Sequence, residues 1–449
     1  MQAMPTPSMP AMTPADLRID PQWIIPVEPA GQVLEAHALI VRDGHILDIL
    51  PVHAADALYQ ASAHQQLPGH ALIPGLINLH THAAMSLLRG YADDLPLMEW
   101  LQGHIWPAEK RWVSPDFVHA GTQLACLEML EGGITCFNDM YFFPEASLQA
   151  ATQAGQRIAS GLIVLDFPTT WAADPDAYLQ QGLAVRDRWL DNPLVHFCLA
   201  PHAPYSVSDR SFEKVATYSA QLDLPIHIHL HESHDEINQS LERYHQRPLA
   251  RLHRLGLVGP QLVAVHAVHL NADEQRLLAQ HGAAIAHCPH SNLKLASGIA
   301  PLAALLTHGL TVGLGTDSAA SNNRLDLWEE MRLAALLAKG TSGQAEAVPA
   351  HQALAMATIH GARALGLDDR IGSLTIGKAA DLVAVDLSGP ETQPCFDPVA
   401  QLIYSAGRAQ VSAVWIAGRA VVREHRAVTL DRDTILARTH YWRERLQGH

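Results

Sequence analysis

The sequence predicts an α/β protein built on a (β/α)8 barrel of the TIM type, with a small β-sandwich domain formed from both chain ends. Three observations predict this architecture. Eight apolar runs of strand length alternate with helix-like runs across the middle of the 449-residue chain, which is typical of a parallel barrel. Short β runs punctuated by Gly and Pro occupy both ends. No G-x-G-x-x-G follows the first barrel strand, so a doubly wound sheet is the less favoured alternative.

The two β-rich ends set the domain boundaries. One β texture extends from Asp16 to about Leu67, and a similar texture returns at residues 381–389 and 412–422. We expect these ends to pair in space, which divides the chain into residues 1–70 (sandwich), 71–380 (barrel) and 381–449 (sandwich). The first fourteen residues lack the basic and apolar regions of a signal peptide, and we expect a loose tail there.

The expected barrel strands are short and apolar. They cover residues 71–82, 133–140, 158–166, 194–200, 225–230, 262–266, 283–287 and 311–315. Amphipathic helices are expected between them, for example at 209–223 and at 271–282, where Asn271 is a suitable N-cap.

Composition excludes several classes of partner. The formal net charge is −15 and no basic run occurs, which argues against nucleic-acid or anionic-membrane binding and leaves a small-molecule substrate. No run of about 18 apolar residues is present, so we expect no membrane span. The five Cys form no C-x-x-C pair, which fits reduced thiols and a cytoplasmic location.

Ligand-capable side chains stand at the ends of the expected strands, where barrels concentrate their chemistry. His80 and His82 share one strand face, as do His227, His229 and His231 on the fifth strand. The 28 His make some His-x-His triplets expected by chance, and period two does not choose among the fifth-strand histidines.

A metal site is nevertheless indicated, because polar groups ending several strands are costly without a shared purpose. Asp317 follows the eighth strand in GLGTDS, although a helix cap is its simpler explanation. Two imidazoles, a third from the fifth strand and one carboxylate suit zinc, with iron or manganese as alternatives. Glu232 can leave the strand and face the pocket as a proton shuttle, or it is a surface residue of the HESHDE turn.

Longer motifs strengthen this interpretation. GLINLHTH, the spacing from His229 to Glu232, the sixth-strand His266 and GTDS resemble the amidohydrolase superfamily. Within it the chain is similar to the 5-methylthioadenosine/S-adenosylhomocysteine deaminases and their triazine-hydrolase relatives. LMEWLQGHIWPAEK, GGITCFNDMY, LAPHAPYSVSD, HSNLKLASGIAP and IGSLTIGKAADLVAVD extend the resemblance over nearly the whole chain.

The resemblance implies a set of site residues. The implied metal ligands are His80, His82, His229 and Asp317, the implied catalytic residues are Glu232, His266 and Asp317, and the implied substrate contacts are Glu109 to ribose, His202 to the purine, and Glu232. Two-metal relatives carry a Lys on the fourth strand. LVHFCLAPHAP has no Lys, so one divalent metal per subunit is expected.

We therefore expect hydrolytic deamination of 5′-methylthioadenosine or S-adenosylhomocysteine to an inosine-type product and ammonia. Residues 166–182 contain no Arg for a homocysteine carboxylate, which favours methylthioadenosine or adenosine. The alternatives are a guanine or cytosine deaminase, a chlorotriazine hydrolase, or a non-catalytic metal-binding protein. The resemblance also suggests a homo-oligomer.

Overall fold

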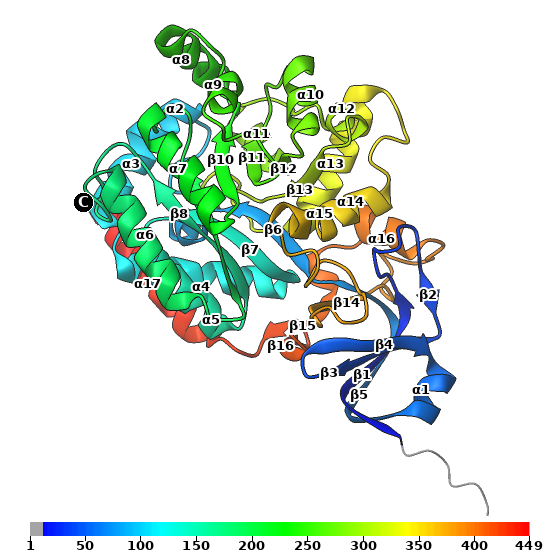
Figure 1. Cartoon of the computed structure of the whole chain (residues 1–449). Helices are drawn as coiled ribbons and strands as arrows, with labels where there is room; N and C mark the ends of the chain where they lie inside the picture. Colours follow the sequence, from blue (N-terminus) through cyan, green and yellow to red (C-terminus); the bar gives the residue numbers. More distant parts are fainter. Residues whose placement is uncertain (1–11, 449) are drawn as a thin grey trace, which may run out of the picture.

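The computed structural model describes residues 12–448, and its centre is a barrel of eight parallel strands (Figure 1). Neighbouring strands follow the chain order: β6 (Leu76–Thr81), β7 (Ile134–Tyr141), β8 (Arg157–Val164), β9 (Val195–Pro201), β10 (Ile226–Leu230), β11 (Leu262–His266), β12 (Ala284–His287) and β13 (Thr311–Leu314). Directly after β13, the Asp317 N–H donates to the His80 carbonyl at 3.0 Å, which ties the last strand to the first. The predicted barrel is confirmed.

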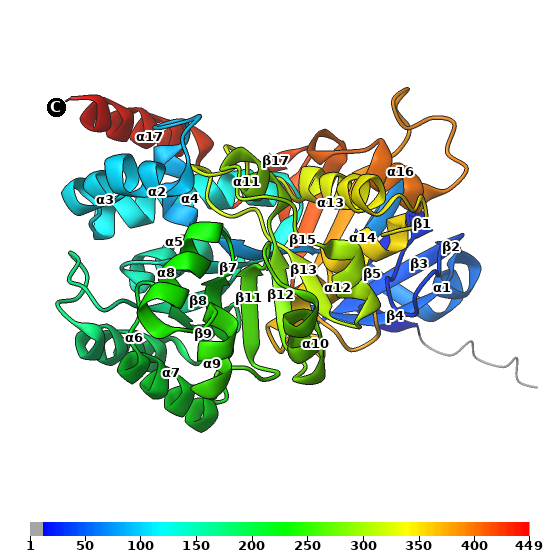
Figure 2. The same ribbon diagram turned by 90° about the horizontal axis from the view of Figure 1, so that it is seen from above.

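Helices surround the strands, as the burial of nearly every strand residue requires (Figure 1, Figure 2). They are α4 (Pro115–Glu131), α5 (Pro144–Ala154), α6 (Pro175–Trp189), α7 (Asp209–Leu222), α8 (His234–Tyr244), α9 (Pro248–Arg254), α10 (Ala272–Gln280), α11 (Pro289–Lys294), α12 (Leu302–Thr307), α13 (Leu327–Ser342), α14 (Ala350–Met356) and α15 (Ile359–Ala364). The expected N-cap of α10 is confirmed: Asn271 Oδ1 accepts the Glu274 N–H at 3.0 Å, and Glu274 Oε2 accepts the Asn271 N–H at 2.9 Å.

A second sheet of nine strands joins the two chain ends, as predicted. Its order is β17 (Arg426–Ala427), β16 (Arg419–Arg423), β15 (Val411–Ile416), β14 (Leu382–Asp386), β5 (Tyr59–Pro74), β1 (Thr13–Ile24), β3 (His37–Arg42) and β4 (His45–Pro51), with β2 (Leu34–Glu35) paired to β1. The N-terminal strands meet the C-terminal ones where β5 runs antiparallel to β14 (Figure 1). The short helix α1 (Val52–Leu58) connects β4 to β5.

The expected first barrel strand, residues 71–82, is wrong as a single element. Residues up to Pro74 pair with β14 in the second sheet, whereas residues from Leu76 pair with β7 in the barrel. Gly75 forms the junction, because a Cβ there would lie 2.0 Å from Thr135 Oγ1. An apolar run does not reveal which sheet each half enters. The strand ends at Thr81, so His82 precedes the 3-10 helix η1 (Ala83–Leu88).

A long insertion follows η1 and lies over the barrel mouth. It contains α2 (Leu97–Trp100), the π-helical turn η2 (Leu101–Ile105) and α3 (Trp106–Trp112). In the second sheet, α16 (Pro398–Tyr404) and the 3-10 turn η3 (Arg408–Gln410) connect β14 to β15.

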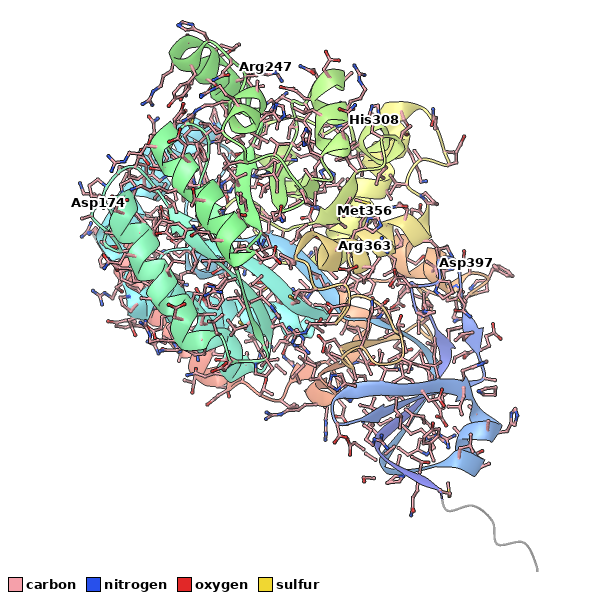
Figure 3. The ribbon with its side chains drawn as sticks, viewed as in Figure 1. Asp174, Arg247, His308, Met356, Arg363 and Asp397 are labelled. Carbon is pink, nitrogen blue, oxygen red and sulfur yellow. The ribbon has the colours of Figure 1, made fainter. Side chains whose placement is uncertain are left out.

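Several contacts join the barrel to the second sheet and its flanking segments. The division into domains at residues 70 and 380 stays a prediction. Arg157 of β8 and Asp381, just before β14, form a buried ion pair at 2.6 Å. Arg363 of α15 pairs with Glu28 at 2.6 Å on the side of the barrel that faces the second sheet (Figure 3). The final helix α17 (Arg432–Gln447) packs against α4 of the barrel, although it belongs to the C-terminal range.

The sequence also predicted a loose N-terminal tail and the lack of a membrane-spanning segment. The expected loose tail lies mostly outside the described residues, and Thr13 and Pro14 already belong to β1. Within residues 12–448, no helix combines the length and apolarity that crossing a bilayer requires.

Candidate active site and metal centre

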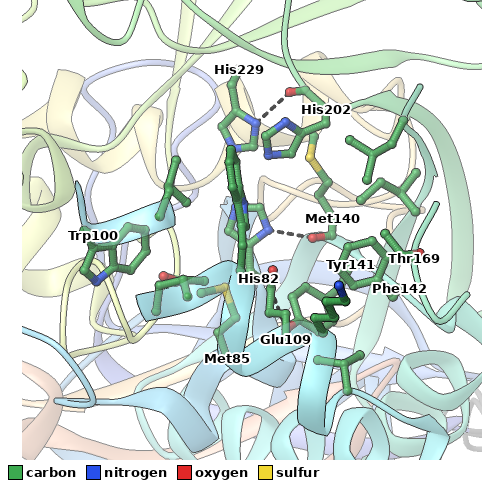
Figure 4. Close-up of a pocket in the computed structure, with 18 of the residues that line it drawn as sticks. His82, Met85, Trp100, Glu109, Met140, Tyr141, Phe142, Thr169, His202 and His229 are labelled. Atoms are coloured by element: carbon green, nitrogen blue, oxygen red, sulfur yellow. Dashed lines mark hydrogen bonds between the residues drawn. The ribbon is translucent and has the colours of Figure 1, made fainter. Parts of the chain in front are cut away.

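The predicted site residues converge on one cavity at the carboxyl ends of the barrel strands. Its volume is about 590 Å³, within the range of small-molecule sites. Seven of the eight predicted residues line it: His82, Glu109, His202, His229, Glu232, His266 and Asp317. Figure 4 labels the first four of them. The eighth, His80, is fully buried directly beside them. These side chains come from six different segments of the barrel, so only the fold brings them together.

The four predicted metal ligands form a compact cluster. Ligand-capable atoms of His80, His82 and His229 all lie within 4.8 Å of one another. Asp317 Oδ1 lies 3.2 Å from His80 Nε2 and 3.4 Å from His82 Nε2. His80, Asp317 and His266 satisfy the same 4.8 Å criterion, so His266 borders the cluster.

Hydrogen bonds orient the imidazoles for metal binding. His82 Nδ1 donates to the Met140 carbonyl at 2.6 Å, and His229 Nδ1 donates to the His202 carbonyl at 2.7 Å (Figure 4). Each bond fixes the tautomer and leaves the Nε2 lone pair facing the cluster. His80 Nε2 is buried and has no hydrogen-bond partner among the described atoms. This orphaned nitrogen and the mixed N/O donor set fit a divalent metal.

Burial favours the neutral form of two ligand imidazoles, His80 and His229, and the neutral form is the one that binds a metal. Desolvation lowers the pKa of His80 to about 4 and places the pKa of His229 well below its usual value. Burial alone would raise the pKa of Asp317, but the neighbouring imidazoles hold it well below the ordinary range. His80 and His229 therefore present neutral nitrogens beside the ionised carboxylate of Asp317.

The structure also distinguishes His227 and His229 of β10 from His231, which directly follows that strand. His227 lies behind the cluster, with its Nε2 2.9 Å from His80 Nδ1. His231 faces away, because its Nε2 accepts the Leu249 N–H at 3.1 Å. Among the three, His229 alone lines the cavity.

Glu232 occupies the position expected of a proton shuttle. It is 7% exposed, which rules out the surface-turn alternative, and its Oε2 lies 3.8 Å from His266 Nε2. Burial raises the pKa of the Glu232 carboxyl. His266 is oriented by Asn292, whose Oδ1 lies 2.8 Å from His266 Nδ1. The cavity thus holds a carboxyl group suited to carrying a proton.

A second carboxylate enters the cavity from the insertion above the barrel. Glu109 lies on α3, and Tyr141 at the end of β7 donates to Glu109 Oε1 at 2.8 Å. Desolvation raises the pKa of Glu109 to about 7. His202 follows β9 and is held by Ser206, with 3.0 Å between His202 Nδ1 and Ser206 Oγ. Apolar side chains form much of the remaining wall, among them Leu97, Trp100, Ile105, Phe142, Ile163 and Leu295.

Comparison with known proteins places this chain in a family. The model of the amidohydrolase family matches residues 71–421. The chain belongs to the amidohydrolase family. This confirms the resemblance on which the site residues were predicted.

Individual relatives cover almost the whole amidohydrolase. A 5-methylthioadenosine/S-adenosylhomocysteine deaminase of Saccharophagus degradans is 45% identical over 97% of this chain and 98% of its own length. The crystal structure of an adenosine deaminase from Xanthomonas campestris with bound zinc is 47% identical, with a TM-score of 0.96 over 98% of this chain and 100% of that one. Atrazine chlorohydrolase from Arthrobacter aurescens, complexed with zinc, is 26% identical, with a TM-score of 0.89 over 95% and 99% of the two chains.

Several site residues of this amidohydrolase were not predicted from the sequence. Ser291 and Ser321 donate to Asp317 Oδ2 at 2.6 and 2.7 Å, and the Ser318 N–H donates to Oδ1 at 2.7 Å. Asp317 therefore faces the imidazoles through Oδ1. The structure also explains why a glycine, Gly315, lies two residues before Asp317. A Cβ at this position would lie 2.8 Å from the His80 backbone nitrogen.

The cations near the cavity bear on the expected lack of an Arg for a homocysteine carboxylate. Arg157 is paired with Asp381, and Arg186 pairs with Asp187, so neither lines the cavity. Among the described residues, Lys110 is the one Lys or Arg that does. Its signal in the sequence is its position next to Glu109.

Proposed function

We propose that this amidohydrolase deaminates adenine nucleosides by hydrolysis, using one divalent metal, zinc, per subunit. The proposed substrates are 5′-methylthioadenosine and/or S-adenosylhomocysteine, and the products are the inosine-type nucleoside and ammonia. The names of relatives that are 40–46% identical over most of the chain support these substrates. A cytoplasmic location and a homo-oligomer stay predictions.

The proposed metal ligands are His80, His82, His229 and Asp317, whose donor atoms converge as described above. A bound divalent metal lowers the pKa of a coordinated water from 15.7 to about 7, which supplies a nucleophile at neutral pH. The hydrogen bonds that His82 and His229 donate to the Met140 and His202 carbonyls orient these two imidazoles before any metal binds.

The other side chains are assigned to proton transfer. As the attacking oxygen bonds to the ring carbon that carries the amino group, Glu232 gives its proton to the adjacent ring nitrogen. Its raised pKa suits this general acid. Asp317 and His266 take the proton of the attacking oxygen. Return of a proton to the amino nitrogen breaks the C–N bond and releases ammonia.

One observation carries the assignment to nucleosides. Two carboxylates, the buried Glu232 and the half-buried Glu109, enter the same cavity, and only one of them is needed for proton transfer to the base. Tyr141 occupies Oε1 of Glu109, which leaves Oε2 to accept hydrogen bonds from ribose hydroxyls. The proposed contact of His202 with the purine and the apolar wall complete a site for a nucleoside with an apolar 5′ group.

The test is a substrate panel. Ammonia release is measured from methylthioadenosine, S-adenosylhomocysteine, adenosine, adenine, guanine and cytosine, with chloride release from atrazine and metal analysis of the same sample. We expect kcat/KM for the nucleosides to exceed that for every free base. A preference for guanine, cytosine or atrazine would contradict the proposal, and turnover of none of them would favour a non-catalytic protein.

A further inference from the structure

A buried carboxylate outside the cavity holds the backbone from which Glu232 projects. Glu236 lies in the first turn of α8 and is 3% exposed. Its Oε1 accepts the His231 N–H at 2.8 Å, and its Oε2 accepts the Glu232 N–H at 2.9 Å. Both carboxylate oxygens are thus bonded to consecutive amides of the loop that leaves β10.

This arrangement differs from an ordinary helix cap. In α10, Glu274 occupies the third helical position and accepts the N–H of the N-cap residue Asn271. In α8, Ser233 is the N-cap and Glu236 holds the same third position. The Glu236 side chain, however, reaches past the cap to the two residues before it. Its hydrogen bonds therefore order the loop instead of closing the helix.

The loop needs such support, because its backbone is strained. His231 has a φ of +55°, in the left-handed region that non-glycine residues rarely adopt. The two bonds from Glu236 fix the amides on both sides of the His231 α-carbon, including the peptide plane that leads into Glu232. The direction of the Glu232 side chain follows from that plane.

No cation neutralises Glu236 by direct contact within residues 12–448. The nearby Arg247, at the outer end of the barrel by α9, instead pairs with Glu274 at 2.6 Å and donates to the His269 carbonyl at 2.7 Å (Figure 3). Burial raises the pKa of the Glu236 carboxyl to about 8, although the two backbone amides and the charge of Arg247 favour its ionised form. A buried carboxyl group held in this way is costly if it serves packing alone.

We infer that Glu236 is a positioning residue that holds Glu232 in place for proton transfer. This inference rests on the proposed function. Glu236 contacts neither the cavity nor the metal cluster, and it acts through the two amides that precede the shuttle.

The first test is Glu236→Gln. The amide keeps the shape of the side chain but turns an NH2 group toward one of the two N–H donors, so one bond is lost. A displacement of about 1 Å at a catalytic group costs about 100-fold, so we expect kcat to fall about 10- to 100-fold while KM and metal content stay within about twofold. Glu274→Gln is the matched control, because it disturbs a buried glutamate at the same helical position. We expect it to lower thermal stability and leave kcat unchanged.

A double-mutant cycle separates positioning from general destabilisation. If Glu236 acts through Glu232, then Glu236→Gln causes no further loss of kcat in a Glu232→Gln background. Persistence of the full loss in that background, or a normal kcat in the single variant, would overturn the inference. Glu236→Asp, which keeps the charge but shortens the reach, answers the same question if the Gln variant does not fold. High activity of Glu232→Gln itself would instead overturn the proton-transfer role of Glu232, whereas the absence of ammonia release by the native protein would overturn the proposed function.

Discussion

Replacing Glu109 by Gln tests whether a sugar hydroxyl binds beside the metal cluster. The amide oxygen can still accept the Tyr141 hydroxyl, which lies 2.8 Å from Oε1 in the native protein. The NH2 group then replaces the oxygen that is free for ribose, so one hydrogen bond to a charged group is lost. Such bonds contribute about 1.5–3 kcal/mol, which corresponds to a loss of about 10- to 150-fold in kcat/KM at about 1.4 kcal/mol per decade.

The assay compares ammonia release from methylthioadenosine and from adenine. The loss should be confined to the nucleoside, because adenine has no sugar for Glu109 to bind. Glu99→Gln is a suitable control, since Glu99 is an exposed carboxylate of the neighbouring helix α2. A nucleoside kcat/KM within twofold of the native value, or an equal loss for adenine, would refute the reasoning.

The pH dependence of the same variant gives an independent check. Burial raises the pKa of Glu109 to about 7, so protonation below that pH removes the acceptor and lowers nucleoside kcat/KM. This acidic limb should disappear in Glu109→Gln. Because the folded-state pKa lies above the unfolded value of about 4.3, the stability that Glu109 contributes at low pH is lost as the pH rises through 7. The variant should therefore gain stability relative to the native protein above pH 7.

Three further perturbations follow from the site geometry. Glu232→Gln should lower kcat by about 100- to 10,000-fold, as removal of a general acid does, with the metal retained in elemental analysis; near-normal turnover would end the shuttle assignment. Lys110→Gln should raise KM for S-adenosylhomocysteine and leave methylthioadenosine unaffected, because Lys110 is the cavity's one described Lys or Arg; equal effects on both substrates would count against this contact. Ser321→Ala should weaken metal retention against a chelator by about 10- to 100-fold, since it removes a bond to Asp317 Oδ2; unchanged retention would show that Ser291 suffices.

The barrel was predictable because each strand is a short, continuous apolar run, and its helices carry regular periodicity and caps such as Asn271. The break at Gly75 was not predictable, because the residues on both sides of it are equally apolar and only their pairing partners differ. The join of β5 to β14 was expected only in outline, since the register between distant strands depends on the folded chain.

The site residues, too, were predictable from the sequence only in part. His80, His82 and Asp317 were identifiable from their positions at strand ends, but a period of two left His227, His229 and His231 equivalent. Their neighbours separate them: the Leu249 amide holds His231, and His80 contacts His227.

Glu109 came only from the family resemblance, because its helix belongs to an insertion whose position over the barrel is a tertiary property. Ser291, Ser321 and Glu236 were not predicted for a related reason. The hydrogen-bond partner of a serine hydroxyl, or of a Glu in the polar HESHDE segment, is set by the folded chain and cannot be read from the local sequence.

The pairing of β5 with β14 has a consequence for biosynthesis. Residues 71–74 leave the ribosome long before residues 382–386, which are their partners. At roughly 5–20 residues per second, translation of the intervening chain takes about 15–60 s. Throughout that interval one side of an apolar strand presents unsatisfied amides and carbonyls to other nascent chains, a known route to aggregation. Protection by a chaperone during synthesis would therefore matter more for this strand than for the barrel strands, whose partners emerge one after another.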